Sequence, residues 1–342
     1  MSNDRKTLAF FTAMLLFTTA VSTTGKKRDK SAEITQAAPE LWQVPSDITA
    51  RNLMYGPGSE QDRPHPPFTF LKEDLSGSNP KFDVRDRDGV KWRVKLGAEA
   101  KPETVASRLV WAVGYYANED YFLPELRVDK MPRLQRKHAE KFIQPDGSML
   151  NVRLKRHLTN EKKIGTWKWR DNPFSGTREL NGLRVMMALI NNWDLKDQNN
   201  SVYSEKHTAK GGPEQIYMVS DLGASFGTTH LVRGHEKAKG NLESYVHSRF
   251  IRDVKDGFVN FEDPHRPAVI VLVNPHEFFS RLNLEWIGRD IPVDDVRWMG
   301  QILSQLSDQQ IRDAFRAAGY TPEDVDAFAS EVESRIGELK NL

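Results

Sequence analysis

Apolar and polar residues alternate in three short stretches of the N-terminal half, which is the pattern of half-buried β-strands. The stretches are Phe68–Lys72, Lys81–Arg85 and Val90–Leu96. A loop of small residues, Glu73–Pro80, separates the first two, and an Asp-Gly turn ending at Gly89 separates the last two. The pattern predicts three antiparallel strands.

Helical spacing replaces alternation in two longer stretches. One runs from Pro102 to Gly114, with proline in the first turn and apolar residues every three or four positions. The other begins after Thr177 and keeps the same spacing up to Asn191. Two helices are therefore predicted.

Between these helices, Lys141–Ile143 and Met149–Leu154 flank a Pro-Asp-Gly turn, which predicts a hairpin. The C-terminal third is predicted to be mostly helical. Ser307 and Gln310 form a capping box before a helix that Gly319 ends, and a last helix follows that glycine.

An apolar run near the N-terminus indicates export. Leu8–Val21 follows two basic residues and precedes small residues that suit a cleavage site. We expect residues 1–25 to be a signal peptide or, alternatively, an uncleaved membrane anchor, because the run is only slightly shorter than the ~20 residues of a spanning helix. Residues 26–67 are polar and then rich in turn residues, and we expect a tail and linker there. In either case the body is expected outside the cytoplasm, secreted or periplasmic.

Composition narrows the class of protein and of partner. The chain has 342 residues, 38% of them hydrophobic, which is enough for one two-lobed domain with a real core. Its 49 basic and 47 acidic residues leave a formal net charge of +2, so nucleic acid is not an expected partner. The absence of cysteine excludes disulfides, thiolate metal sites and a cysteine nucleophile.

The candidate chemistry is concentrated in two short segments. The first contains Asp194, Lys196 and Asn199, and the second places Asp221 directly after an apolar strand. Phosphoryl transfer from a magnesium nucleotide needs such groups. Asp194 can accept the proton of an attacking hydroxyl, and Lys196 can neutralise charge on the transferred phosphoryl group. Asn199 and Asp221 offer hard oxygen ligands to Mg²⁺. We therefore take the first two as catalytic and the last two as metal ligands.

The order and spacing of these segments resemble those of the protein-kinase-like superfamily. Asp194-Leu195-Lys196 with Asn199 matches its catalytic loop, and Asp221-Leu222-Gly223 stands where its metal-binding Asp-Phe-Gly stands. The resemblance implies an α+β, two-lobed protein-kinase-like fold. Its β-rich N-lobe would span residues 68–154, and its mainly helical C-lobe, with the catalytic loop, residues 155–342.

The same resemblance implies a nucleotide site upstream. Lys95 looks like the third-strand lysine that contacts the phosphates, and Glu103 like its partner on the following helix, with Glu99 in reserve. Gly77 and Ser78 lie where a phosphate-covering loop is expected, although the usual three-glycine pattern is missing. The implied cofactors are ATP and Mg²⁺ or Mn²⁺.

Several positions depart from the ordinary kinase pattern. Asn192-Trp193 replaces His-Arg before the catalytic aspartate, Leu222 replaces phenylalanine, and no Ala-Pro-Glu marker follows. These departures resemble the divergent branches of the superfamily: HipA-like kinases, phosphatidylinositol kinases and secretory-pathway kinases.

A pair of tryptophans and a cluster of histidines are less specific signals of function than the kinase-like segments. Trp167 and Trp169 lie among basic residues and could stack on bases, but the balanced charge and the export signal favour packing or substrate contact. His230 and His235 with Glu236 fit no zinc motif, so a solvated loop is expected there.

The leading hypothesis is an exported, ATP-dependent, kinase-like phosphotransferase that moves a phosphoryl group to a hydroxyl acceptor on a protein, lipid or small molecule. Two alternatives stay open. One is an exported pseudokinase that serves as a binding or scaffold module. The other is nucleotidyl transfer on the same fold, with the nucleotide reversed.

Overall fold

The computed structural model describes residues 38–77, 79–205, 214–228, 239–262 and 283–342. The described residues all belong to one compact unit. The predicted export segment, Ser78 of the predicted phosphate loop and the histidine group at residues 230–236 lie outside the described residues. None of the described helices is both long and apolar enough to cross a bilayer.

A six-stranded sheet forms the N-terminal part of the compact unit, in the order β5-β7-β4-β3-β2-β6. All neighbours are antiparallel except β2 and β6. The strands are β2 (Phe68–Asp74), β3 (Lys81–Arg85), β4 (Lys91–Lys95), β5 (Asp120–Leu126), β6 (Val128–Asp129) and β7 (Met149–Arg156). The three antiparallel strands predicted from alternation correspond to β2, β3 and β4.

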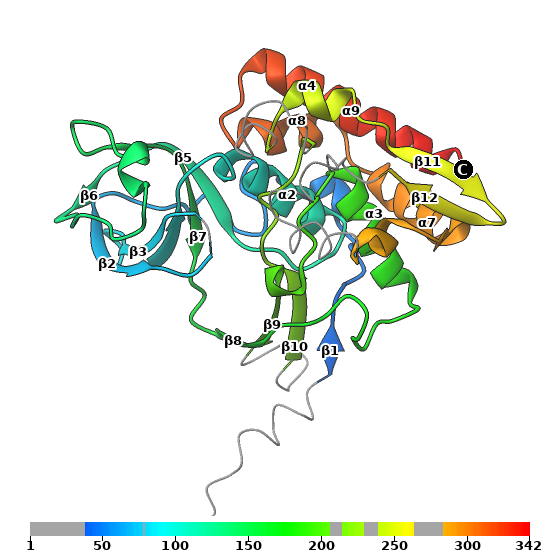
Figure 1. The fold of residues 1–342 in the computed structure, drawn as a ribbon, viewed down its shortest axis with the longest axis horizontal. Coiled ribbons are helices and arrows are strands. Elements are labelled where there is room, and N and C mark those ends of the chain that lie inside the picture. Colours follow the sequence, from blue (N-terminus) through cyan, green and yellow to red (C-terminus); the bar gives the residue numbers. More distant parts are fainter. Residues whose placement is uncertain (1–37, 78, 206–213, 229–238, 263–282) are drawn as a thin grey trace, which may run out of the picture. The chain divides into compact units, whose positions relative to one another are not determined.

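Helix α2 (Ala100–Ala112) connects β4 to β5. It matches the helix predicted from Pro102 to Gly114, and it brings Glu103 into its first turn. In Figure 1, α2 lies between the six-stranded sheet and the group of C-terminal helices.

Two smaller sheets follow. One has the order β1-β10-β9-β8 and the other β11-β12-β13. Their strands are β1 (Pro39–Glu40), β8 (Glu161–Gly165), β9 (Asn200–Glu205), β10 (Glu214–Val219), β11 (Ile251–Lys255), β12 (Phe258–Phe261) and β13 (Ile291–Pro292). The β9–β10 pair lies between the two segments that carry the candidate chemistry, with Asp194, Lys196 and Asn199 before β9 and Asp221 after β10.

The remaining helices lie in the C-terminal half, and three of them begin at the predicted caps. They are α3 (Arg178–Leu189), α4 (Leu242–Val246), α7 (Val293–Leu303), α8 (Asp308–Arg316) and α9 (Pro322–Lys340). Short 3₁₀ turns occur in both halves of the chain: η1 (Ile48–Ala50), η2 (Ala139–Phe142), η3 (Asp197–Asn199) and η5 (Glu285–Gly288). Thr177, Ser307 and Thr321 each accept a hydrogen bond from a backbone N–H of the first turn. These contacts satisfy donors that a helix N-terminus otherwise leaves unpaired.

Two hydrophobic cores give the unit its two-lobed architecture. The smaller core lies in the six-stranded sheet and includes Phe82, Trp92, Val94 and Leu154. The larger core joins the C-terminal helices to the apolar residues of α2. The predicted α+β, two-lobed fold is confirmed, and α2 is held by the larger core although it belongs in sequence to the smaller lobe.

The folded body begins earlier than the turn-rich segment predicts. Leu41, Ile48 and Leu53 are buried in the larger core, and β1 pairs with β10. The expectation that residues 38–67 are only tail and linker is therefore wrong. Proline and glycine exclude long helices in this stretch, but they allow an irregular segment that packs through a few apolar side chains.

Three other local expectations need correction. Lys141–Ile143 is not a strand, because η2 extends to Phe142 and only Ile143 forms a bridge to Met149. Strand β5 was not predicted at all. The C-terminal third is helical only in part, since the β11–β12 hairpin precedes its long helices.

Trp167 and Trp169 are packing residues in this fold. Both are buried, and their rings meet edge to face with centroids 4.8 Å apart. The indole nitrogen of Trp167 donates to the carbonyl of Met218 at 3.0 Å. Of the two roles expected for these residues, the contacts support lobe packing.

We predict that Gly114→Ala destabilises the protein by about 3 kcal/mol. Gly114 has φ of +100°, and an added Cβ would lie 2.3 Å from the carbonyl oxygen of Gln43 and 2.6 Å from the indole nitrogen of Trp42. Gly89→Ala is the matched control, because Gly89 has φ of +81° with no atom within 4 Å of an added Cβ. Its cost should be about 1–2 kcal/mol, the backbone strain alone. If urea unfolding gave the same loss of stability for Gly114→Ala and Gly89→Ala, the packing of the Trp42–Gln43 segment against the end of α2 would be contradicted.

Candidate active site

A cleft of about 680 Å³ lies between the six-stranded sheet and the β8–β9–β10 part of the four-stranded sheet. Lys95, Glu103, Asn199 and Asp221 line it, as does Gly77. Residues from both halves of the sequence therefore meet in one cavity.

Strand β4 turns Lys95 towards this cleft. Its neighbours Trp92, Val94 and Leu96 are buried in the smaller core. Because side chains alternate across a strand, Lys95 faces the opposite side of the sheet.

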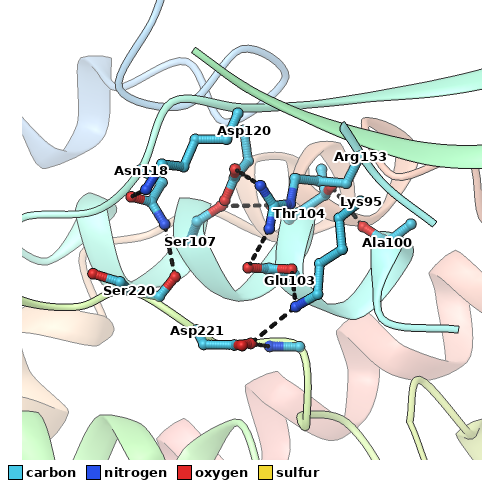
Figure 2. A network of polar contacts seen from close by, with 12 residues as sticks. Lys95, Ala100, Glu103, Thr104, Ser107, Asn118, Asp120, Arg153, Ser220 and Asp221 are labelled. Carbon is cyan, nitrogen blue, oxygen red and sulfur yellow. Dashed lines mark hydrogen bonds and ion pairs between the residues drawn. The ribbon is translucent and has the colours of Figure 1, made fainter. Parts of the chain in front are cut away.

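The ammonium of Lys95 is the centre of the site. Its Nζ lies 3.0 Å from Oε2 of Glu103 and 3.0 Å from Oδ1 of Asp221, and it also forms an ion pair with Glu99. Lys95 and Asp221 are 126 residues apart in sequence. Figure 2 shows Lys95 reaching from its strand down to Asp221, with Glu103 beside it. The two glutamates that compete for the predicted role of Lys95's partner thus both contact it.

A second buried pair holds Glu103 from the other side. Arg153, from β7, donates to Oε1 of Glu103 at 2.8 Å, and its Nη1 lies 3.4 Å from Oδ1 of Asp120. All three side chains are at most 6% exposed. The carboxylate of Glu103 therefore bridges two cations, as Figure 2 shows.

Electrostatics within the cluster keep Lys95 and Asp221 charged. Burial alone would lower the pKa of Lys95, but the carboxylates of Asp221, Glu103 and Glu99 raise it above its usual range. Burial works to raise the pKa of Asp221, but the Lys95 ammonium outweighs it and holds that pKa below normal. For Glu103, burial prevails over Arg153 and Lys95 and raises the pKa.

The candidate catalytic loop is tied to the segment that carries Asp221. The backbone carbonyl of Asn199 accepts from the N–H of Ser220 at 2.8 Å and of Asp221 at 3.2 Å. The side-chain amide of Asn199 donates to the carbonyl of Asp194 at 2.5 Å. Asn199 therefore holds the loop closed and stands beside Asp221.

Asp194 and Lys196 lie next to each other on this loop. Nζ of Lys196 is 3.3 Å from Oδ1 of Asp194, and both side chains are 28% exposed. The side chain of Asn192 accepts from the N–H of Asp194 at 3.0 Å. Neither Asp194 nor Lys196 belongs to the lining of the cleft. They would therefore contact a substrate that comes from the solvent side and not one bound within the cleft.

Gly223, in the Asp-Leu-Gly segment, is required by close packing. A Cβ there would lie 2.7 Å from Cβ of Glu99 and 2.9 Å from its Oε2. The N–H of Gly223 donates to Oδ1 of Asp221 at 3.3 Å. Glu99 in turn forms an ion pair with Lys239. Glycine thus lets the Asp221 segment approach the start of α2.

The predicted phosphate loop carries a lysine beside it. Gly77 has φ of +66°, and a Cβ there would lie 3.1 Å from Nζ of Lys81. Lys81 also contacts Oγ of Ser76 at 3.4 Å, and both residues line the cleft. Burial lowers the pKa of Lys81. Ser78, predicted with Gly77 to cover the phosphates, lies outside the described residues.

The donor set fits a hard divalent cation. The side chain of Asp221 is 45% exposed, and its described contacts use Oδ1, which leaves Oδ2 for a cation. The amide nitrogen of Asn199 is used within the loop, so its oxygen is the atom available to a ligand. Carboxylate and amide oxygens suit Mg²⁺ or Mn²⁺.

Comparisons with known proteins give kinases as similar structures. No protein-family model matches the chain, and no curated protein matches it in sequence. A Helicobacter pylori proinflammatory kinase, CtkA, is 10% identical with a TM-score of 0.44, over 80% of this chain and 96% of that one.

Two structures of a Golgi casein kinase are also similar. One is 11% identical with a TM-score of 0.31, over 79% of this chain and 74% of that one. The other, with Mn/ADP bound, is 10% identical with a TM-score of 0.34, over 91% and 88%. The chain has a protein-kinase-like fold, as its own motif order, sheet order and Lys95–Asp221 contact indicate.

Three site residues were not predicted from the sequence: Asp120, Arg153 and Lys81. Asp120 and Arg153 act on Glu103 from strands that pair only in the folded chain. A signal for Arg153 does exist, because it stands between the buried Val152 and Leu154 on an alternating strand. A basic residue at such a position faces away from the apolar core.

We predict that Arg153→Met destabilises the protein by about 3–5 kcal/mol at pH 7, because it leaves Asp120 buried without its ion pair and Glu103 with Lys95 as its remaining described cation. The folded state already binds the Glu103 proton more tightly than the unfolded chain does, since burial raises this pKa. Loss of the guanidinium raises it further. The cost of the variant should therefore shrink as pH falls from 7 towards ~4.3, the usual glutamate pKa.

Urea unfolding at pH 7 and pH 5 measures this cost. Arg127→Met is the control, because Arg127 is 61% exposed and pairs with exposed carboxylates, so little change is expected at either pH. A cost for Arg153→Met that is small, or that does not depend on pH, would contradict its role as the buried cation of Glu103.

Proposed function

We propose that this protein is a kinase-like phosphotransferase that moves a phosphoryl group from a nucleoside triphosphate to a hydroxyl acceptor. One observation carries the proposal: the Lys95 ammonium lies 3.0 Å from Glu103 and 3.0 Å from Asp221, in the lining of a cleft that Asn199 also lines. Phosphoryl transfer is catalysed mainly by positioning and charge stabilisation, and this arrangement supplies both.

Each group has a defined task in the proposed reaction. Lys95, held by Glu103, would bind the phosphates, and Lys81 would add a second cation at the loop around Gly77. Asn199 and Asp221 would hold Mg²⁺ or Mn²⁺ through their side-chain oxygens. When bound, the metal neutralises charge on the phosphates.

Asp194 would act on the acceptor. The acceptor oxygen forms a bond to the γ-phosphorus, the bond from that phosphorus to the β,γ-bridging oxygen breaks, and the hydroxyl proton passes to the Asp194 carboxylate. Lys196, 3.3 Å from Asp194, would stabilise negative charge on the transferred group. Both side chains are partly exposed, so an acceptor can reach them from solvent.

Retained charges support an enzyme over a scaffold. Asp221 is ionised, nearly half exposed and close to two glutamates whose oxygens lie within 4.8 Å of its own. Lys95, Arg153 and Lys239 balance these three carboxylates, and Oδ2 of Asp221 stays outside its described contacts, so it can bind a metal that a scaffold would not need. We also propose that the protein acts outside the cytoplasm, on the basis of the apolar run Leu8–Val21.

We predict that Asp194→Asn lowers phosphotransfer by about 10²–10⁴-fold, because an amide cannot accept the hydroxyl proton. Transfer is followed with γ-labelled ATP and GTP in the presence of Mg²⁺ or Mn²⁺, as autophosphorylation and as release of labelled phosphate. Asp171→Asn, at an exposed position outside the site, is the control and should keep wild-type activity. Unchanged transfer in Asp194→Asn would exclude Asp194 as the base.

The products identify the reaction class. A nucleoside diphosphate as the product indicates phosphoryl transfer, whereas pyrophosphate with a nucleotide-modified protein indicates nucleotidyl transfer. Absence of any product, together with binding of the nucleotide, would move the assignment to a pseudokinase.

A further inference from the structure

The cleft has a second end beyond the phosphate-binding residues, and this end is polar. In the ladder between β4 and β7, Lys95 is paired with Arg153, and Arg93 is paired with Lys155. Two residues along a strand advance it by about 6.6 Å on the same face. Arg93 and Lys155 therefore line the cleft one step further from Asp221 than Lys95 does, where the base of a bound nucleotide would lie.

Arg93, from the six-stranded sheet, and Tyr203, from the four-stranded sheet, bring planar groups to the lining of this end. The guanidinium of Arg93 forms ion pairs with Asp74 and Asp83 and is 23% exposed. Tyr203 and Met218, from β9 and β10, line the opposite side. A guanidinium held by two carboxylates offers a flat surface on which an aromatic ring can stack. This end is therefore built for a base.

Charge at this end is too balanced for a second phosphate site. Arg93 is neutralised by two carboxylates, and Arg156 is likewise paired with Asp62 and Glu119. The phosphates are drawn instead to Lys81 and Lys95 and to the metal ligands. Lys163 also lines the cleft, but at an exposed position on β8.

Lys155 is the exception to this balance. Its Nζ donates to Oδ1 of Asn118 at 3.0 Å and to the hydroxyl of Tyr203 at 3.2 Å. Asn118 is fixed in turn, because its amide donates to the carbonyl of Ser220 at 2.9 Å, a bond that Figure 2 shows. Among the described residues, the contacts of this ammonium include no ion pair with a carboxylate.

An ammonium has three N–H donors and no acceptor. The described contacts of Lys155 use two donors, so the third is available to a ligand that offers an acceptor. The 6-oxo group of guanine or hypoxanthine is an acceptor, whereas the 6-amino group of adenine is a donor. An adenine that placed its amino group here would meet a group unable to accept its hydrogen bond.

We propose that Lys155 selects the base of the nucleotide, and that this protein binds 6-oxopurine nucleoside triphosphates in preference to ATP. The inference rests on the proposed function, since it requires a nucleotide in the cleft. It names a class of substrate and a residue that determines specificity. The phosphate-binding residues and metal ligands specify neither, because all nucleoside triphosphates share the same phosphates.

The test compares ATP with inosine triphosphate, which differs from ATP in having the 6-oxo group in place of the 6-amino group. Dissociation constants are measured by calorimetry on the full chain with Mg²⁺. We expect wild-type protein to bind inosine triphosphate about five- to tenfold more tightly, the lower part of the range for donor–acceptor matching at a base edge. The dissociation constant of GTP should be close to that of inosine triphosphate, because guanine has the same 6-oxo group.

Variants assign the preference to Lys155. Lys155→Met keeps the aliphatic stem and removes the donors, so it should bind the two nucleotides equally. Lys155→Arg should keep the preference for the 6-oxo base. Lys162→Met removes an exposed lysine of β8 outside the cleft lining and should behave as wild type.

The outcomes separate this inference from the proposed function. Wild-type binding of ATP as tight as that of inosine triphosphate overturns the base preference but leaves a nucleotide site in place. A preference that persists in Lys155→Met overturns the role of Lys155. If neither nucleotide binds, the proposed function fails and the inference fails with it.

Discussion

The site depends on one buried ammonium. Lys95 leaves a strand of the smaller lobe and contacts Glu103 on helix α2 and Asp221 on the segment after β10. Three elements that are distant in sequence are thereby held at one point. Because burial opposes the charge on every member, the cluster is stable only when cation and carboxylates are present together. A single charge deletion therefore affects both the fold and the phosphate site.

Helix α2 is positioned more firmly than one ion pair could achieve. Its apolar residues, including Val105 and Leu109, pack into the larger core, while Glu103 is held between Lys95 and Arg153 on the side of the sheet. Lys101 also donates to the carbonyl of Gly319, at the end of α8, at 2.7 Å. These contacts fix the helix against both lobes. They hold Glu103 beside Lys95.

Many of the strands and helices, and four residues of the candidate site, could be predicted from the local sequence. Alternation gave β2, β3 and β4, and caps and helical spacing gave α2, α3, α8 and α9. The candidate residues Lys95, Glu103, Asn199 and Asp221 were found because their order along the chain is distinctive, and the structure brings them to one cleft.

The rest depends on contacts between distant segments. Arg153 and Asp120 acquire their relation to Glu103 only through strand pairing, which the spacing of apolar residues does not specify. The segment around Leu41 looked like a linker, because a few apolar residues among turns show no period before they are seen to pack. Lys155 was passed over for the same reason, since its partners Asn118 and Tyr203 are 37 and 48 residues away.

Nucleotide-dependent thermal unfolding tests the central claim most directly. A triphosphate that binds only the folded protein, at 100 times its dissociation constant, stabilises it by about 2.7 kcal/mol. We expect ATP or GTP with Mg²⁺ to raise the unfolding temperature of the wild type. We expect no such rise without the metal or in Asp221→Asn, when each protein is compared with its own ligand-free sample. An equal rise in wild type and variant, or none in either, would contradict a metal–nucleotide site centred on Lys95 and Asp221.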